Sequence, residues 1–266
     1  MRPNTTPLYN LFRRSSILLV FFSLLILSCT TKNATWQRIE QNGILRVGLD
    51  PSYPPFENLL DDQLVGIDID LLNAMGDGLG LTVQFDIIGY DGLYDALLTG
   101  RVDVLASALI IDETRTKEFA YSDSYFNAGQ VLVTAVGSAI EQLDGQVVAV
   151  ELGAGGHVVA TERQKQGATF EIVVFDSAEN ALLALTQNKA TVTLTDSVSA
   201  RLFIAQHPNL QISDPAITVE PYALATRRAD KQLLAKLNTR LQNLVQSGQL
   251  ELIIERELVS EAAVAR

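Results

Sequence analysis

One cysteine, Cys29, occurs in the 266-residue sequence, so the chain cannot form an intramolecular disulfide. The only two histidines, His157 and His207, lie far apart and outside any HExxH or cysteine-containing motif, which argues against zinc catalysis. Basic residues are also scarce, because 20 lysines and arginines stand against 31 acidic residues, for a net charge of −11. Such a chain repels nucleic acid and anionic lipid headgroups. No nucleophile motif occurs, and the sequence indicates neither a cofactor nor a metal site.

The sequence also lacks an apolar run of the roughly 20 residues that a membrane-spanning helix needs. Its longest apolar run, Ile17–Leu27, follows two arginines and ends just before Cys29. This order is typical of an export signal. We expect residues 1–28 to be a signal peptide, and residues 29–35 to be a lipidated cysteine followed by a polar tether. The alternative is a cleaved soluble signal with an incidental cysteine. Removal of the signal leaves 17 basic and 31 acidic residues, a net charge of −14.

The body of the chain, from about Trp36, alternates β-rich runs with amphipathic stretches. The predicted strands are Ile44–Leu49, Thr82–Ile88, Val102–Ala106, Val131–Val136, Val147–Val150, Phe170–Phe175 and Thr191–Leu194. Apolar residues recur at helical spacing between them, in Ile69–Leu79, Leu93–Leu97 and Ala178–Leu185. This alternation indicates an α/β fold with parallel strands and helices on the sheet faces.

Two segments have the same order of features, which suggests two lobes of similar construction. Tyr90–Ser107 and Phe175–Thr195 each run from an aromatic-Asp pair through a helical pattern into a short turn and a strand. If there are two lobes, the candidate crossings are Asn127–Gly129 and Val219–Tyr222. A late helix, Ala229–Gln246, would then pack back on the first lobe. Ligands of open α/β sheets bind beyond the carboxyl ends of strands, so the cleft between the lobes is the expected site.

A strand, a polar turn with Arg115 and an aromatic, acidic segment follow one another within residues 101–130. Two other motifs accompany them: Asp50–Glu57 and Gly66–Leu71. Together they resemble the family 3 extracellular solute-binding proteins, the amino-acid receptors of bacterial ABC importers. The resemblance extends from Gly43 to Glu257.

The resemblance implies a two-lobed, type II periplasmic-binding-protein-like fold with two hinge crossings. Each lobe would be a mixed sheet flanked by helices. Lobe 1 would comprise residues 36–127 and 222–266, and lobe 2 would comprise residues 128–221. The ligand would lie in the cleft and contact both lobes only when the cleft is shut, which gives it the differential affinity that drives closure.

Two charged residues are the main candidates for holding an amino acid. The planar guanidinium of Arg115 matches a carboxylate with two parallel hydrogen bonds. On spacing alone, a surface ion pair with Glu113 or Glu118 is the simpler interpretation, but the resemblance implies that Arg115 grips the ligand α-carboxylate. Asp196 follows a predicted strand and precedes a predicted helix, so it could be only an N-cap. The resemblance implies that it also accepts hydrogen bonds from the ligand α-ammonium.

Seven further positions match the ligand-binding positions of the family. Tyr53 and Tyr90 would sandwich the ligand side chain, although either ring could instead be core packing. Asp50 could receive a basic side chain. The remaining four positions are Ala108, Ile110, Gly153 and Gly155. Ala108 and Ile110 lack the hydroxyl that is frequent there in the family, and the glycine-rich turn leaves backbone N–H groups free at a helix start.

The resemblance therefore predicts a receptor that is not an enzyme and that delivers an amino acid or similar small zwitterion to an ABC permease. We expect a monomer without a cofactor, anchored by lipid in the periplasm or on the outer face of the cytoplasmic membrane. Two alternatives stay open. One is an enzyme similar to the periplasmic cyclohexadienyl dehydratase of this fold, with Glu151 or His157 as its acid or base. The other is a ligand-sensing receptor that is not coupled to transport.

Overall fold

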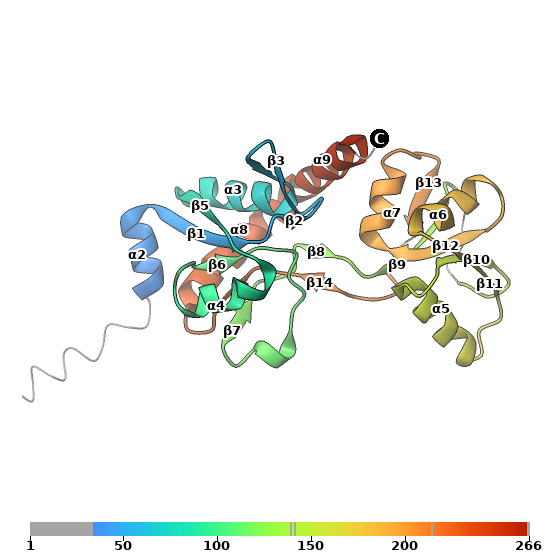
Figure 1. The fold of residues 1–266 in the computed structure, drawn as a ribbon, viewed down its shortest axis with the longest axis horizontal. Helices are drawn as coiled ribbons and strands as arrows, with labels where there is room; N and C mark the ends of the chain where they lie inside the picture. Colours follow the sequence, from blue (N-terminus) through green and yellow to red (C-terminus); the bar gives the residue numbers. More distant parts are fainter. Residues whose placement is uncertain (1–33, 139, 141, 214, 265–266) are drawn as a thin grey trace, which may run out of the picture.

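The computed structural model forms two α/β lobes joined by a pair of crossing segments (Figure 1). It describes residues 34–138, 140, 142–213 and 215–264. The predicted signal peptide, Cys29 and most of the tether lie outside the described residues. Within those ranges, none of the helices has both the length and the hydropathy that crossing a bilayer requires.

The sheet of the first lobe has the strand order β5-β1-β6-β15-β7. Its strands are β1 (Ile44–Leu49), β5 (Thr82–Ile87), β6 (Val104–Leu105), β7 (Phe119–Tyr121) and β15 (Ala225–Arg227). β1 pairs in parallel with β5 and β6, whereas β15 is antiparallel to β6 and β7. The predicted strand Ile44–Leu49 is confirmed. The expected mixed sheet is confirmed, because β15 enters antiparallel to its neighbours on the return of the chain from the second lobe.

The second sheet has the corresponding order β11-β10-β12-β9-β13. Its strands are β9 (Gln130–Ala135), β10 (Val147–Glu151), β11 (Glu171–Phe175), β12 (Val192–Asp196) and β13 (Leu210–Ser213). β10, β11 and β12 are parallel, and β9 is antiparallel to β12 and β13. This sheet is therefore also mixed, and the antiparallel strand β9 is the one that enters directly from the first lobe.

Helices cover both sheets. In the first lobe they are α2 (Ala34–Asn42), α3 (Ile67–Leu79), α4 (Leu93–Leu98), α8 (Lys231–Gln246) and α9 (Gln249–Val264). In the second they are α5 (Gly155–Lys165), α6 (Ala178–Thr186) and α7 (Ser197–Ile204). α8 contacts α2 and α3, so the predicted late helix does pack on the first lobe. Neither α2 nor α9 was predicted from the sequence, although α9 packs against α3 and α8 and also reaches α7 of the second lobe.

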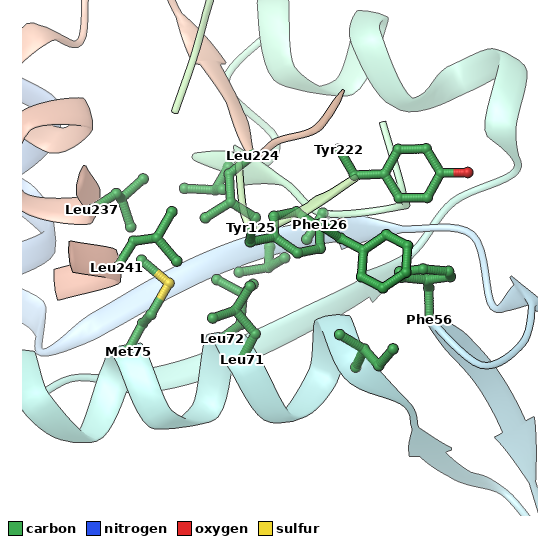
Figure 2. Close-up of a cluster of buried hydrophobic side chains, with 14 of the residues drawn as sticks. Phe56, Leu71, Leu72, Met75, Tyr125, Phe126, Tyr222, Leu224, Leu237 and Leu241 are labelled. Atoms are coloured by element: carbon green, nitrogen blue, oxygen red, sulfur yellow. The ribbon is translucent and has the colours of Figure 1, made fainter. Parts of the chain in front are cut away.

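An aromatic cluster connects the core of the first lobe to the crossing segments (Figure 2). Phe56 is fully buried, and its ring centroid lies 5.0 Å from that of Phe126 and 5.1 Å from that of Tyr222. Phe126 belongs to β8 (Phe126–Asn127) and Tyr222 to β14 (Pro221–Tyr222). The loop that carries Phe56 is thereby fixed against both crossings.

The two crossings form a short antiparallel ladder of β8 with β14. The Asn127 carboxamide oxygen accepts hydrogen bonds from the N–H groups of Gly129 (3.1 Å) and Glu220 (2.8 Å). A side chain at Gly129 would come within 2.1 Å of the Thr218 carbonyl oxygen, so the close approach of the two segments requires glycine. Both candidate crossings predicted from the sequence lie within this ladder or directly beside it.

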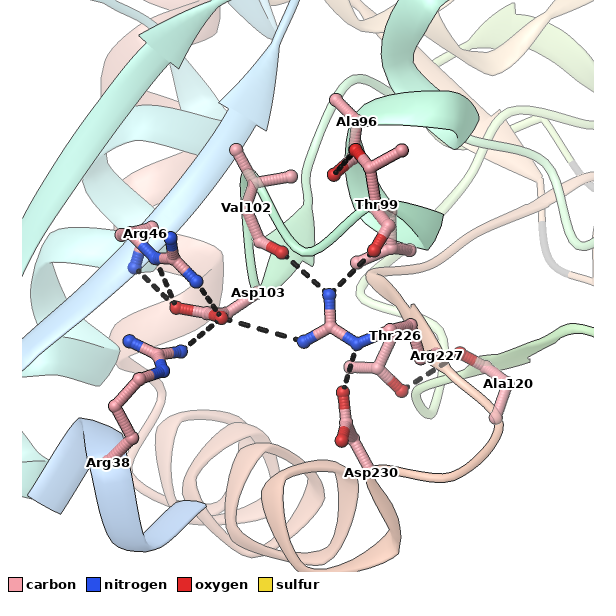
Figure 3. Close-up of polar contacts among 11 residues, drawn as sticks. Arg38, Arg46, Ala96, Thr99, Val102, Asp103, Ala120, Thr226, Arg227 and Asp230 are labelled. Carbon is pink, nitrogen blue, oxygen red and sulfur yellow. Dashed lines mark hydrogen bonds and ion pairs between the residues drawn. The ribbon is translucent and has the colours of Figure 1, made fainter. Parts of the chain in front are cut away.

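A buried ion cluster joins several elements of the first lobe (Figure 3). The carboxylate of Asp103, which is fully buried, forms ion pairs with Arg38 of α2, Arg46 of β1 and Arg227 of β15. Arg227 also pairs with Asp230, at the start of α8, over 2.7 Å. One carboxylate therefore holds together α2, β1 and β15, which come from the start and the end of the sequence of this lobe.

Candidate functional site

A pocket of about 970 Å³ opens where β1 and β6 end, next to the short 3₁₀ turns η2 (Tyr90–Gly92) and η3 (Glu113–Arg115). Parallel sheets bind ligands beyond the carboxyl ends of their strands, so the position is the expected one. The lining includes all first-lobe residues predicted from the sequence: Asp50, Tyr53, Tyr90, Ala108, Ile110 and Arg115. The fold brings them together from four separate segments. Their contact with a ligand stays a prediction.

Arg115 is half-exposed at the end of η3 and is held from two sides. Its guanidinium carbon lies 4.3 Å from the centre of the Tyr94 ring, and its Nε donates to Asp112 Oδ2 over 3.2 Å. Hydrogen bonds from the Thr114 hydroxyl and N–H, followed by the charge of Arg115, hold the pKa of Asp112 below its usual range. The alternative partners considered for Arg115, Glu113 and Glu118, are wrong.

The two terminal nitrogens of the Arg115 guanidinium form no hydrogen bond and no ion pair with the described residues. Their only contact there is the stacking of the guanidinium on the Tyr94 ring. The end of the guanidinium fork is therefore available to a ligand carboxylate. Neither Tyr94 nor Asp112 was predicted from the sequence. The spacing of Tyr94, one helical turn from Tyr90, could have identified it, whereas spacing does not distinguish Asp112 from Glu113 or Glu118 as the partner of Arg115.

Tyrosine side chains form the walls of the pocket. Tyr90 is 58% exposed and Tyr53 is 45% exposed, so neither residue belongs to the core. The hydroxyls of Tyr53 and Tyr222 lie 3.3 Å apart, and burial together with this hydrogen bond raises the pKa of Tyr222. Tyr222 comes from β14, so the pocket borders directly on the crossing segments.

The floor of the pocket is built by the segment after β6. The N–H of Asp50 donates to Ser107 Oγ over 3.1 Å, and Asp50 Oδ2 accepts from the Tyr90 N–H over 2.7 Å. Ala108 has a φ of 44°, a left-handed conformation that is costly for a residue with a side chain. Ile110 is half-exposed and forms a β-bridge with Tyr222. The hydroxyl of Ser107 is already bound within the protein, because it accepts from the Asp50 N–H and donates to Glu57 Oε1.

The charge of the lining is strongly asymmetric. Five carboxylates line the pocket at its rim and walls: Asp50, Asp91, Asp95, Asp112 and Glu113. A sixth acid, Glu57, lines it from below and is almost completely buried. Arg115 is the only basic residue among the described residues that line the pocket. The described residues contain no group of three or more histidine, cysteine or acidic side chains arranged to hold a metal ion.

The predicted second-lobe residues do not line this pocket. Asp196 ends β12 and caps α7, because its Oδ1 accepts the Ser199 N–H over 2.8 Å. Gly153 and Gly155 precede and open α5, and Gly153 has a φ of 76°. The N–H of Gly153 donates to His157 Nδ1 over 3.0 Å, so one of the free N–H groups expected at this turn is already bound.

The two candidates for an acid or base, Glu151 and His157, also lie away from the pocket. Glu151 is the last residue of β10, and His157 is in the first turn of α5. Neither is among the lining residues. Both belong to the second lobe, like Asp196, Gly153 and Gly155.

Comparisons with known proteins agree on one family. A family model described as bacterial extracellular solute-binding proteins, family 3, matches residues 45–258. The histidine-binding periplasmic protein of Escherichia coli (strain K12) is 27% identical over 251 residues, which cover 90% of this chain and 95% of that protein.

Solved structures show the same likeness. An ancestral cationic amino acid solute-binding protein is 30% identical, with a TM-score of 0.61 over 84% of this chain and 99% of its own. The L-cystine solute receptor of Neisseria gonorrhoeae, in its unliganded open conformation, is 25% identical, with a TM-score of 0.72 over 85% of this chain and 97% of its own.

Proposed function

The chain belongs to the bacterial extracellular solute-binding proteins of family 3, and we propose that its Arg115 pocket is the first-lobe half of an amino-acid site. As a member of this family, it is a solute-binding component of amino-acid transport by an ABC permease. One observation carries the proposal for the site: six residues chosen from sequence motifs converge on one pocket, in which Arg115 is the only base among the described lining residues. The ligand α-carboxylate would bind to the free end of its guanidinium.

The second half of the site would come from the second lobe. We place the lobe limits at residues 36–127 with 222–266, and at residues 128–221. Asp196, Gly153 and Gly155 lie outside the pocket in this structure, as they should when the lobes are apart. A ligand held by Arg115 would gain the Asp196 contact only on closure, and this gain would favour the closed state. The likeness to an unliganded open receptor supports this interpretation.

The acidic lining favours a cationic side chain on the ligand. Once Arg115 neutralises the α-carboxylate, five carboxylates remain around the rest of the molecule. An acidic side chain would be repelled, whereas a guanidinium, ammonium or imidazolium would be attracted. Two of the similar proteins carry names that specify histidine or cationic amino acids. We therefore propose a basic amino acid as the ligand.

Calorimetric titration of the purified protein with L-arginine and L-citrulline tests this proposal. The two amino acids have nearly the same shape and the same α-groups, but only arginine carries a charged side chain. We expect L-arginine, or L-lysine or L-histidine in a parallel titration, to bind tightly and L-citrulline to bind far more weakly. Equal affinities for L-arginine and L-citrulline would contradict the charge argument while leaving an amino-acid receptor intact. Turnover of prephenate or arogenate would favour the enzyme alternative instead.

The protein acts outside the cytoplasm, as its family does. We propose further that a monomer is anchored at the outer face of the membrane by lipid on Cys29. Cys29→Ser is expected to move the protein from the membrane fraction to the soluble fraction, because the lipid-bearing thiol is lost. The measurement is immunoblotting of the separated fractions. Unchanged membrane association of the variant would count against lipidation and leave the ligand site unaffected.

A further inference from the structure

Two acidic side chains meet beneath the floor of the pocket. Glu57 is the first residue of β3 (Glu57–Leu60), and Asp68 lies in the first turn of α3; their exposed fractions are 1% and 0%. No arginine or lysine of the described residues pairs with either carboxyl. Buried acids without a cation are unusual, because burial strongly disfavours the charged form.

The chain is built to bring these two acids together. The N–H groups of Ile67 and Asp68 donate to the carbonyl oxygens of Pro55 and Phe56, over 3.0 and 2.9 Å. These bonds tie the start of α3 to the loop just ahead of Glu57. Gly66 makes the approach possible, since a Cβ at this residue would lie 2.4 Å from the Phe56 oxygen.

Their oxygen atoms require one proton between them. Glu57 Oε1 accepts from the Ser107 hydroxyl over 2.8 Å, and Asp68 Oδ2 accepts from the Ala108 N–H over 2.9 Å. The other two oxygens, Glu57 Oε2 and Asp68 Oδ1, are buried and have no hydrogen bond of normal geometry to the described residues. Two neighbouring buried carboxylates repel each other, whereas a proton on one of them removes a charge and supplies a donor.

The proton belongs mainly to Glu57. Burial and the neighbouring charge of Asp68 raise the pKa of Glu57, and burial also raises the pKa of Asp68. Asp68 keeps more of its charge, because the Ala108 N–H and the Tyr125 hydroxyl both lower its pKa. The titratable groups that face the pair are Asp50, from the end of β1, and Tyr125, which precedes β8.

The acid pair is connected to the pocket through two neighbouring residues. Ser107 bridges Glu57 to the N–H of Asp50, and Asp68 holds the N–H of Ala108 in its left-handed conformation. A strained backbone of this kind persists only where surrounding contacts determine it. The segment held in this way leads directly to Ile110 and Arg115.

We propose that Glu57 and Asp68 are positioning residues of the pocket, which share one buried proton and fix the Ser107–Ala108 segment beneath the ligand. Loss of the proton would place two like charges together and displace this segment. The pocket would then lose its shape as the pH rises. The expected effect on a ligand rests on the function proposed above, whereas the shared proton itself does not.

Glu57→Gln removes the ionisable group but keeps the size and shape of the side chain. The amide nitrogen can donate to Asp68, and the amide oxygen can accept from Ser107, but the group cannot ionise. In the wild type, the native state retains a proton that the unfolded chain releases above the usual glutamate pKa of about 4.3. The unfolding equilibrium constant should therefore rise with pH, by at most about tenfold per pH unit, between about pH 6 and pH 8.

Urea unfolding over this pH range, without ligand, is the decisive measurement. Glu57→Gln should remove the pH-dependent increase, and the control Asp70→Asn should retain it, because Asp70 is a more exposed acid of the same helix that pairs with Arg256. Titration with L-arginine between pH 6 and pH 8 should give the same pH dependence in wild type, Glu57→Gln and Asp70→Asn, because the folded protein keeps the shared proton throughout this range. Failure of L-arginine to bind any variant would contradict the proposed ligand but not the shared proton. A Glu57→Gln variant with the wild-type slope would overturn the inference.

Asp68→Ala tests the contact to the backbone directly. It removes the acceptor of the Ala108 N–H, so hydrogen exchange of this amide, measured by NMR, should become at least about tenfold faster than in Asp70→Asn. Unchanged protection of Ala108 would overturn the positioning role of Asp68. If Asp68→Ala does not fold, the pH dependence of Glu57→Gln still decides the inference.

Discussion

Arg115→Ala is expected to weaken binding of L-arginine by about 2–4 kcal/mol, which corresponds to roughly 30- to 1,000-fold in Kd. The variant removes the only base among the described lining residues and leaves the ligand α-carboxylate facing five carboxylates. The loss should exceed that of an ordinary hydrogen bond, because a guanidinium contributes both charge and a planar pair of donors. Isothermal titration calorimetry of the folded variant measures it.

Two control variants define what Arg115 contributes. Glu118→Ala removes a carboxylate three residues away that neither lines the pocket nor forms an ion pair with Arg115. It should bind with the wild-type affinity. Arg115→Lys keeps the charge but loses the fork and the stacking on Tyr94, so its affinity should lie between those of the wild type and Arg115→Ala. A wild-type Kd for Arg115→Ala would show that the carboxylate binds elsewhere.

The long, periodic elements of the fold were predictable from the sequence, and the short ones were not. β1 spans the predicted residues, and α8 begins within two residues of its predicted start. Strands such as β8 and β14 are two residues long, which is too short to show an alternation of apolar and polar residues. α9 was missed because its exposed residues include Leu252 and Val259, so its apolar positions do not form one clean stripe.

Some residues of the site were likewise predictable from the sequence, and others were not. Residues at strand ends and in family-like motifs, such as Arg115 and Tyr53, could be placed in the pocket from the sequence. The Asp112 partner could not be chosen over Glu113 or Glu118, because all three are acids within reach along the chain. The Glu57–Asp68 pair was beyond prediction, since it depends on the tertiary contact of the Phe56 loop with α3.

Asp103→Ala should have the largest effect on stability, lowering the free energy of unfolding by about 3 kcal/mol. The change leaves three guanidiniums, those of Arg38, Arg46 and Arg227, around an empty position without their common counter-charge (Figure 3). We expect the lower end of the range for broken buried pairs, because Arg38 and Arg46 are partly exposed to water. Urea unfolding at neutral pH measures the loss.

The pH dependence of Asp103 distinguishes this cluster from a simple packing effect. Burial alone would raise the pKa of Asp103, but the hydrogen bonds from Arg46 and Arg38 outweigh it and lower the pKa below the usual value of about 3.9. A carboxylate with a lowered native pKa stabilises the fold above the unfolded pKa and loses this effect as the pH falls through the native one. The difference between wild type and Asp103→Ala should therefore be full at neutral pH and shrink below about pH 4.

Asp86→Ala is the matched control for this variant. Asp86 forms a surface ion pair with Arg101 over 3.2 Å in the same lobe, and both side chains are in contact with water. Solvent screening limits such a pair to under about 1 kcal/mol. Asp103 does not line the ligand pocket, so L-arginine should bind to folded Asp103→Ala as it does to the wild type. If Asp103→Ala were no less stable than Asp86→Ala, the four-residue cluster would not hold α2, β1 and β15 together, and the apolar core would have to hold them by itself.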